Sequence, residues 1–450
     1  MSIIIAGDRS GVGKTTVTLA LLAALRQRRQ AVQSFKVGPD YIDPMFHTYI
    51  TGRACRNLDP ILTSEDYVQQ CFTRHSQGIS YTLIEGVMGL FDGALGTSDV
   101  GSTAHVARLL NIPIVLVLNC SSISRSIAAI VHGFCTFDPR IRVAGVILNQ
   151  VGSDRHVELL SQALEPLSLP ILGVLRRQDN ITIPDRHLGL VPTAELSQLN
   201  AIVEQLAHLG QTCFDWPKLL PLLSCKEQDV EPEAASPPVK VRLAIAQDEA
   251  FSFYYEDNLK ILQQLGAELV PWSPLHDRTL PKGIQGLYFG GGFPEIFAAA
   301  LAENRPAQQA VKSSILAGIP TYAECGGLMY LCEKIVDFAE RDYPMTGIVP
   351  TAAVMEKRLT LGYRKATALQ NSPLVKEGDR FWGHEFHRSS LMLAPTQPLL
   401  ALQGYDAQSQ FPPEGWLHYR VHASYIHVHF GAQSHLAKRF LKHCQDWNRP

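Results

Sequence analysis

The chain has 450 residues, more than one hydrophobic core usually holds, so we expect two domains. Its composition, 46% hydrophobic and 18% charged, is that of an ordinary water-soluble protein, and its net charge is only −2. This balance creates no overall field that would attract nucleic acid or an anionic membrane. The longest apolar run, residues 112–118, is far below the ~20 residues of a membrane helix. The sequence therefore predicts no nucleic-acid partner and no membrane association.

The cysteines and the N-terminal segment indicate the cellular compartment. The nine cysteines are odd in number and scattered, with no Cys-x-x-Cys pair. This pattern argues against a disulfide framework or a structural zinc site, and it favours a reducing cytoplasm. The apolar run at residues 3–5 is followed almost at once by Asp8, so we interpret it as a buried strand rather than a signal peptide. We predict a cytoplasmic protein. Its oligomeric state stays open, a homodimer included.

Residues 1–225 alternate short apolar runs with helical patterns. This alternation predicts an α/β domain with a doubly wound, mostly parallel sheet of the P-loop type. Continuous Val, Ile and Leu runs suit strands that are covered on both faces. We expect strands at 2–6, 31–37, 81–85, 113–119 and 143–149, and a helix at 14–28.

Residues 226–240 are rich in charge and proline, which predicts a linker between domains 1–225 and 241–450. The alternation of strands and helices restarts after it, so the second domain is also expected to be α/β. Strands are expected at 241–246, 267–271, 286–289 and 320–323, and helices at 256–265 and 307–317. Residues 358–369 and 421–429 have the pattern of antiparallel strands.

A glycine-rich segment, Gly-Asp-Arg-Ser-Gly-Val-Gly-Lys-Thr-Thr at residues 7–16, joins the first expected strand to the first expected helix. The backbone N–H groups of such a turn and the following helix N-terminus bind phosphate. Lys14 adds a charge for the β- and γ-phosphates, and the hydroxyl of Thr15 can hold Mg²⁺. The predicted ATP-binding residues are Gly11, Val12, Gly13, Lys14, Thr15 and Thr16.

The spacing of this loop is longer than the usual Walker A motif. Five residues rather than four separate Gly7 from Gly13, and this variant is typical of dethiobiotin synthetase-like proteins. Partition-type ATPases carry a signature lysine where this chain has Arg9. A chance glycine-rich turn is the alternative, but the order of strand, loop and helix favours a nucleotide site.

Two acidic segments, residues 36–44 and 85–93, follow the second and third expected strands. Ligands of open α/β sheets bind at the carboxyl ends of the strands, and carboxylates there can hold Mg²⁺. The predicted metal ligands are Thr15, Asp40 and Glu85, and the residues expected around the acid to be activated are Asp40, Tyr41, Ile42, Glu85 and Asp92. The alternative is that these carboxylates cap helices or turns. This alternative has more weight for Asp43 than for Asp40 and Glu85.

In the second domain an apolar strand runs directly into Cys325-Gly-Gly. Glycines let the backbone turn tightly there and leave room for a substrate carbonyl. The candidate base is His427 or His429, which we expect on one side of a strand. Gly290, Gly291, Gly292 and Gly326 are the expected oxyanion and glutamine-binding residues. A lone cysteine is more often a small core residue, but the order of these motifs favours a nucleophile.

Eight segments in this order are similar to those of the cobyrinic acid a,c-diamide synthase family, over essentially the whole chain. They are residues 36–44, 85–93, 248–259, 290–295, 322–330, 361–364, 383–387 and 423–427. The resemblance implies a dethiobiotin synthetase-like front domain and a class I-like glutamine amidotransferase domain behind it. It also implies that Cys325 is the nucleophile and that His427 is the base. Ordinary class I enzymes have Glu where this chain has His429, so the third member stays open; Glu385 and His387 are speculative orienting groups.

The resemblance further implies a ligase that uses ATP and Mg²⁺. It would take ammonia from L-glutamine and amidate the a and c acetate groups of a corrinoid acid through acyl phosphates. The same chemistry on hydrogenobyrinic acid or nickel-sirohydrochlorin, or a cobyric acid synthase, stays open. A partition-like ATPase switch without glutaminase activity is a remote alternative.

Several other residues are expected to have no role in catalysis. The histidines at 47, 75, 105, 132 and 156 are interpreted as surface or turn residues rather than ligands. Cys332 is expected in the core, on the same helix that follows Cys325.

Overall fold

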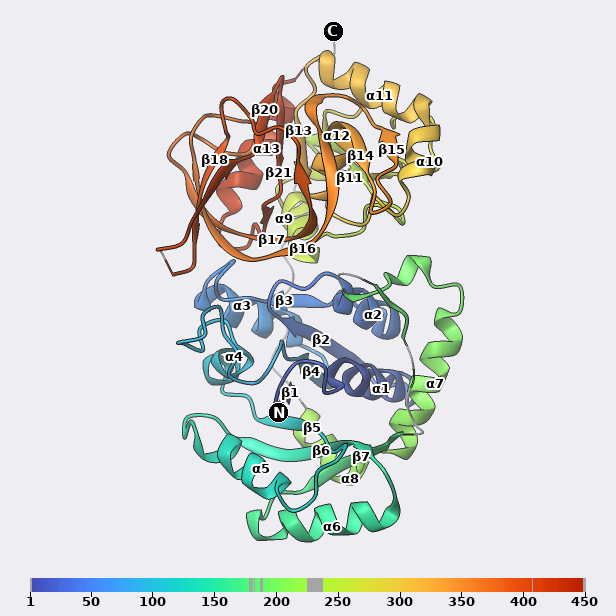
Figure 1. Ribbon diagram of the computed structural model, residues 1–450, viewed down its shortest axis with the longest axis vertical. Coiled ribbons are helices and arrows are strands. Elements are labelled where there is room, and N and C mark those ends of the chain that lie inside the picture. The colour runs from blue at the N-terminus through green and yellow to red at the C-terminus, as the bar shows by residue number, and fades with distance from the viewer. Residues whose placement is uncertain are drawn as a thin grey trace. The chain divides into compact units, whose positions relative to one another are not determined.

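The computed structural model describes residues 2–177, 181, 183–186, 189–224, 238–406 and 408–447, except for the side chains of 185 and 186. The chain divides into two compact units, Met1–Pro232 and Glu233–Pro450 (Figure 1). The expected linker at 226–240 lies outside the described residues apart from 238–240. Among the helices that the structure describes, none combines the length and the apolarity that a bilayer crossing would need.

The first unit is built on a parallel sheet of seven described strands in the order β3-β2-β4-β1-β5-β6-β7. The strands are β1 Ile3–Gly7, β2 Val32–Val37, β3 Arg56–Leu58, β4 Tyr81–Glu85, β5 Ile114–Asn119, β6 Val143–Val151 and β7 Ile171–Arg176. Every residue of β1 and β2 is buried. Strand β1 is a continuous apolar run, as expected for a strand covered on both faces, whereas β2 also buries Gln33, Ser34 and Lys36.

Helices connect these strands and cover the sheet (Figure 1). They are α1 Lys14–Gln27, α2 Ile42–Thr51, α3 Glu65–Ser76, α4 Thr103–Leu110, α5 Ile127–Thr136, α6 Asp154–Leu164, α7 Leu199–Thr212 and α8 Trp216–Leu223. Two short antiparallel strands, β8 Asp185–Arg186 and β9 Gly189–Leu190, precede α7. In the sheet, Ile5 of β1 lies beside Glu85 of β4, so the loop that follows β1 and the segment that follows β4 meet at one edge.

The second unit has two described sheets. The first has the order β11-β10-β12-β13-β21-β20 and is parallel except for β20. Its strands are β10 Val241–Ala246, β11 Ala267–Trp272, β12 Gly286–Phe289, β13 Thr321–Glu324, β20 Trp416–His418 and β21 Val421–Ser424. The helices of this unit are α9 Glu256–Gln264, α10 Ala298–Glu303, α11 Arg305–Leu316, α12 Gly326–Leu331 and α13 Ser434–Gln445.

The other sheet of this unit has the order β15-β14-β16-β17-β22, with β18 and β19 added beside β16. Its strands are β14 Cys332–Val336, β15 Asp342–Pro344, β16 Val349–Ala368, β17 Arg380–Leu391, β18 Leu400–Gly404, β19 Gln410–Glu414 and β22 His427–Val428. The pairs β16–β17 and β17–β22 are antiparallel. Both units are therefore α/β, which confirms the predicted fold class.

The single antiparallel strand expected at 421–429 is wrong. Residues Val421–Ser424 form β21, which is parallel to β13 in the first sheet, whereas His427–Val428 form β22 in the second sheet. The chain changes sheets between the two strands, and an apolar pattern alone cannot show to which sheet each half belongs.

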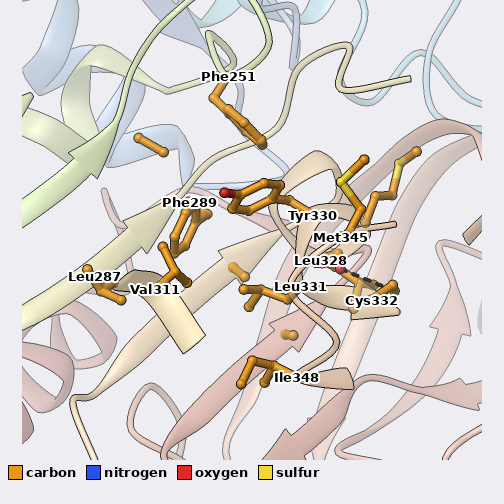
Figure 2. Close-up of a cluster of buried hydrophobic side chains, with 14 of the residues drawn as sticks. Phe251, Leu287, Phe289, Val311, Leu328, Tyr330, Leu331, Cys332, Met345 and Ile348 are labelled. Carbon is orange, nitrogen blue, oxygen red and sulfur yellow. Dashed lines mark hydrogen bonds between the residues drawn. The ribbon is translucent and has the colours of Figure 1, made fainter. Parts of the chain in front are cut away.

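A buried aromatic and aliphatic cluster holds the turn that carries Cys325 (Figure 2). Leu328, Tyr330 and Leu331 of α12 are fully buried in it, and the ring of Tyr330 lies 5.8 Å from that of Phe289 on β12. Cys332 is buried as expected, but it begins β14 instead of continuing α12. The short helix is therefore fixed between β13 and β14 by core packing.

Candidate active sites

The loop between β1 and α1, residues 8–13, has a backbone that glycine adopts most easily. Gly11 and Gly13 have φ angles of 76° and 95°, left-handed values that side chains rarely adopt. A Cβ on Gly13 would also collide with the side-chain amide of Asn149. That amide donates a hydrogen bond to the carbonyl of Val12 (2.8 Å). The carboxyl end of β6 therefore supports the loop, and the loop offers its N–H groups ahead of α1.

Lys14, the first residue of α1, is 8% exposed. Its ammonium donates hydrogen bonds to the carbonyl oxygens of Met88 (2.5 Å) and Arg9 (3.3 Å). Burial and the nearby charge of Lys36 lower the pKa of Lys14. Because these partners are neutral carbonyls, the ammonium can move to phosphate oxygens and gain the stronger, charge-assisted hydrogen bonds.

A buried charge network lies next to this loop. Thr15 Oγ1 donates to Glu85 Oε1 (2.6 Å), and the same carboxylate oxygen lies 2.8 Å from Lys36 Nζ. Lys36 also pairs with Asp43 (2.6 Å). The second oxygen of Glu85 lies 2.7 Å from His47 Nε2. Three side chains from different elements thus converge on one fully buried carboxylate at the end of β4.

The network keeps Glu85 ionised. Burial raises the pKa of Glu85, but Lys36 and His47 more than offset this and lower it below its usual range. Burial also acts to lower the pKa of Lys36, and the carboxylates of Asp43 and Glu85 raise it instead. In the same way, the contacts of His47 with Cys55 and Glu85 overcome burial and raise its pKa to about 10. The result is a set of fixed charges beneath the phosphate loop.

The acidic residues near the phosphate loop, Asp40, Asp43 and Asp92, differ in the groups that they contact. Asp40 Oδ1 accepts hydrogen bonds from the backbone N–H groups of Ile42 (2.8 Å) and Asp43 (3.0 Å), so it caps the start of α2. Asp43, in contrast, faces Lys36, and burial and the charge of Asp40 raise its pKa to about 7. Asp92 also accepts a backbone N–H, from its own loop (2.9 Å). The capping alternative therefore describes Asp40 and Asp92.

The oxygen atoms beside the phosphate loop are of the kind that binds magnesium, and in this structure the ammonium of Lys36 contacts the same oxygens of Glu85 and Asp43. The hydroxyl of Thr15 lies 2.6 Å from an oxygen of Glu85 and 3.4 Å from an oxygen of Asp43. Hydroxyl and carboxylate oxygens are the hard ligands that Mg²⁺ prefers, and they stand at the start of α1, where nucleotide phosphates would bind.

In the second unit, Cys325 stands on a strained turn between β13 and α12. Its φ and ψ are 48° and −99°, a conformation that costs a non-glycine residue roughly 1–3 kcal/mol. The backbone N–H of Cys325 donates to the carbonyl of Ser424 on β21 (2.8 Å). A Cβ on Gly326 would lie 3.1 Å from the backbone N of Gly292, and one on Gly327 would lie 2.5 Å from a side chain of β12. Close packing therefore requires glycine at 327 and leaves little room for a side chain at 326.

The glycine loop after β12 approaches the same turn. The carbonyl of Gly290 accepts the N–H of Gly327 (3.0 Å), and the N–H of Gly290 donates to the hydroxyl of Tyr254 (2.8 Å). A Cβ on Gly291 would lie 2.6 Å from Cε1 of His427. The imidazole of His427 thus stands directly against the glycine loop, and the N–H of Gly290 is engaged within the protein.

Burial keeps the thiol and the imidazole neutral. Cys325 is 4% exposed and His427 is fully buried. Burial and the charge of Glu295 raise the pKa of Cys325 far above its usual range. Burial, together with His384 and His387, lowers the pKa of His427 to about 3. At neutral pH the imidazole is therefore unprotonated and able to accept a proton.

His429 has a different environment from His427. Its Nε2 atom lies 3.7 Å from Asp257, its Nδ1 accepts the N–H of Gly431 (3.1 Å), and its ring lies 4.8 Å from that of Tyr255. Strand β22 ends at Val428, so the two histidines do not lie on one side of a common strand as expected. The geometry places His427 against the glycine loop.

Both units match known families. Residues 3–191 match the CobQ/CobB/MinD/ParA nucleotide binding domain, and residues 242–435 match the CobB/CobQ-like glutamine amidotransferase domain. The chain is 60% identical to a cobyrinate a,c-diamide synthase of Synechococcus sp., over 99% of this chain and 98% of that protein. The chain belongs to the cobyrinate a,c-diamide synthase family. This family consists of glutamine-dependent amidotransferase ligases, so the chain is an enzyme of that kind.

Two further relatives of this family span the whole chain. One is a cobyrinate a,c-diamide synthase of Synechocystis sp., 52% identical over 99% of this chain and 93% of that protein. The other is a hydrogenobyrinate a,c-diamide synthase of Streptomyces coelicolor, 42% identical over 98% of this chain and 97% of that protein. The family membership predicted from the sequence is confirmed.

Glu385 and His387, the two residues suggested as orienting groups, contact Arg364 and Tyr425. Glu385 pairs with Arg364 (2.5 Å) and lies 3.5 Å from His387. The ring of His387 stacks on that of Tyr425, with centroids 3.9 Å apart. These four side chains line a cavity of about 600 Å³ in the second unit. Glu385 and His387 thus belong to the wall of this cavity.

Four residues of the two sites were not predicted from the sequence, and a fifth, Asp43, was considered there with more weight on a capping role. Lys36, Asp43 and His47 form the charge network, Asn149 supports the phosphate loop, and Glu324 lies 3.9 Å from the imidazole of His427. The interpretation of His47 as a surface residue is wrong, because its side chain is fully buried. A signal for it existed, since Asp43 and His47 are four residues apart and therefore share one face of α2.

Proposed function

We propose that this chain amidates the a and c acetate carboxylates of cobyrinic acid, using ammonia from L-glutamine and energy from ATP. The observation that carries the proposal is the strained turn of Cys325, where Gly326 packs against the Gly291–Gly292 loop and Gly291 in turn packs against the imidazole of His427. Full-length similarity to synthases of that name supports the substrate. The second unit would act as the glutaminase and the first as the synthetase.

In the glutaminase half, the proton of the Cys325 thiol passes to Nε2 of His427, and the thiolate attacks the carboxamide carbon of glutamine. Backbone N–H groups of Gly291, Gly292 and Gly326 are the proposed donors to the oxyanion. The proton returns from His427 to the departing nitrogen, and ammonia leaves. Water then releases glutamate from the thioester, with His427 as the base again.

In the synthetase half, a carboxylate of the substrate attacks the γ-phosphorus of ATP, and ADP leaves. Lys14 would move from the carbonyls of Met88 and Arg9 to the phosphate oxygens. Thr15, Glu85 and Asp43 would hold Mg²⁺, in place of the set with Asp40, since Asp40 caps α2. A bound Mg²⁺ supplies positive charge near the phosphates. Ammonia then displaces phosphate from the acyl phosphate and forms the amide.

A second substrate has support of its own. The relative of Streptomyces coelicolor is named for hydrogenobyrinate, the same reaction class on a different macrocycle. We also place the activity in the cytoplasm, in agreement with the unbridged state of the cysteines that the structure describes.

A turnover experiment tests the proposal. Cobyrinic acid, hydrogenobyrinic acid and nickel-sirohydrochlorin are offered side by side with ATP and glutamine, and mass spectrometry records conversion of carboxyl groups to carboxamides. We expect two conversions on cobyrinic acid, and none with the Lys14→Ala variant as a control. Preferred turnover of another macrocycle would reassign the substrate, and no conversion of any of the three would overturn the proposal.

A further inference from the structure

Glu324 lies beside the imidazole of His427, which also contacts the glycine loop. It is the last residue of β13, directly before Cys325. Its side chain is 3% exposed, and Oε2 lies 3.9 Å from Nδ1 of His427. A Cβ on Gly291 of the glycine loop would lie 2.6 Å from Cε1 and 3.4 Å from Nε2. Nδ1 therefore faces a carboxylate while Nε2 faces the loop.

Hydrogen bonds from three strands fix the position of this carboxylate. Oε1 accepts the N–H of Val428 on β22 (2.9 Å) and the hydroxyl of Tyr322 on β13. Oε2 accepts the hydroxyl of Tyr288 on β12 (3.1 Å). A buried carboxylate with several donors is held in one orientation, and here that orientation directs an oxygen toward the imidazole.

We propose that Glu324 is the third member of the thiol site, a positioning residue that acts through His427. This inference rests on the roles proposed above for Cys325 and His427. In ordinary class I enzymes, the third member is a glutamate two residues after the base. In this chain we assign that role to Glu324, the residue directly before the nucleophile. Here His429 stands in that later place and contacts Asp257 instead.

The carboxylate would act at two moments of the reaction. Before the reaction, an acceptor beside Nδ1 favours the tautomer with the proton on Nδ1, so that Nε2 is unprotonated and able to accept a proton. When the thiol proton of Cys325 reaches Nε2, the ring becomes an imidazolium, and the adjacent carboxylate stabilises that charge. The separation of 3.9 Å exceeds a hydrogen bond, so the two groups must approach as the charge forms.

Other titratable groups surround this pair and must be considered in any pH profile. They are Tyr254, Tyr288, Tyr322, Cys325, His384, His387 and Glu385. Burial raises the pKa of Glu324 to about 7, although the hydroxyls of Tyr322 and Tyr288 and the N–H of Val428 lower it. The substitution of choice is therefore one that removes the charge of Glu324 and keeps its shape.

The test is Glu324→Gln in the full-length chain. A glutamine can still accept the N–H of Val428 and the hydroxyl of Tyr322, so the fold should be preserved. We expect kcat for glutamate release from glutamine to fall about 10²–10⁴-fold, with KM changed less than about threefold. Ammonium-driven amide synthesis should stay within about twofold. Labelling of Cys325 by iodoacetamide, followed by peptide mass spectrometry across pH 6–9, should require a higher pH in this variant than in the native chain.

Two companion variants separate positioning from folding. Glu324→Asp keeps the charge and should recover part of the lost kcat. Tyr322→Phe removes a hydrogen bond to the same carboxylate but keeps its charge, and it should lower the melting temperature while glutamate release stays within severalfold. Full kcat in Glu324→Gln would overturn the inference, and so would a parallel loss of glutamine-driven and ammonium-driven synthesis with a lower melting temperature.

The proposed function fails in a different way. If Cys325→Ala still released glutamate at the native rate, the thiol itself would not be the nucleophile. If Cys325→Ala were inactive while Glu324→Gln kept the native kcat and the native pH dependence of labelling, the proposed function would stand and the role of Glu324 would be refuted.

Discussion

The two units treat buried ionisable groups in opposite ways. In the first, Lys36, Glu85 and His47 are buried together, and their mutual contacts keep them charged. In the second, Cys325 and His427 are as deeply buried, and burial keeps both neutral. Burial by itself therefore does not decide the charge state; the presence of an opposite charge within hydrogen-bond distance does.

This difference suits the two proposed reactions. Phosphoryl transfer depends on fixed charges that stay in place while the negative charge of phosphate redistributes. Amide hydrolysis by a thiol depends on a proton that moves, so its groups must start neutral and become charged only during the reaction. Each unit thus has the electrostatics that the reaction proposed for it needs.

The largest effect should follow from breaking the charge network. Lys36→Met leaves the buried carboxylates of Glu85 and Asp43 without their cation, and we expect the free energy of unfolding of the first unit to fall by about 3–5 kcal/mol. This loss of stability is measured by hydrogen exchange in peptides from β1 and β4 across a urea series.

The matched control for that substitution is Lys218→Met. Lys218 pairs with Asp215 at 2.7 Å, but both side chains are solvent-accessible, so the expected change in the free energy of unfolding is small. Equal losses for the two variants would mean that burial gives the network no special strength.

A smaller effect is expected from crowding the neutral site. A methyl group in Gly291→Ala would lie 2.6 Å from Cε1 of His427 and displace the imidazole. Glutamate release should fall about 10²–10³-fold, the range seen on loss of one oxyanion donor. Gly133→Ala, where no atom lies within 4 Å of the added carbon, serves as the control. Native kinetics in Gly291→Ala would show that His427 need not stand at the glycine loop.

The smallest effect, counted per pH unit, is a change in the pH dependence of stability. The pKa of His47 is raised from 6.5 to about 10, so its stabilising contribution is complete below pH 6.5 and is lost as the pH rises toward 10. Between pH 7.5 and 10, above the pKa of about 7 of Asp43, the native first unit should lose up to about 1.4 kcal/mol per pH unit. In His47→Gln the same hydrogen-exchange series should be nearly flat, and an unchanged slope would contradict the network.

Much of the fold could be predicted from the sequence, because its strands are long apolar runs. The expected strand at 81–85 coincides with β4, and that at 286–289 coincides with β12. Strand β3 was missed because Arg56–Leu58 is too short to show a pattern. The division of residues 421–429 between two sheets was missed because pairing partners far along the chain decide it.

The sites were predictable in part for a similar reason. The loops that carry Lys14 and Cys325 have glycine motifs. These motifs reflect the local backbone conformation, so they can be recognised within a few residues of sequence. The roles of Lys36 and Glu324 depend on contacts with Glu85 and His427, which lie 49 and 103 residues away in the sequence. No spacing rule predicts such contacts.

The most direct test of two distinct chemistries is the Cys325→Ser variant, assayed for amide synthesis with glutamine and, separately, with ammonium salts. Glutamine-driven synthesis should fall at least about 10³-fold, as for loss of a catalytic nucleophile, while ammonium-driven, ATP-dependent synthesis stays within about twofold of the native rate. An equal loss with both nitrogen sources, or native synthesis from glutamine, would contradict the account.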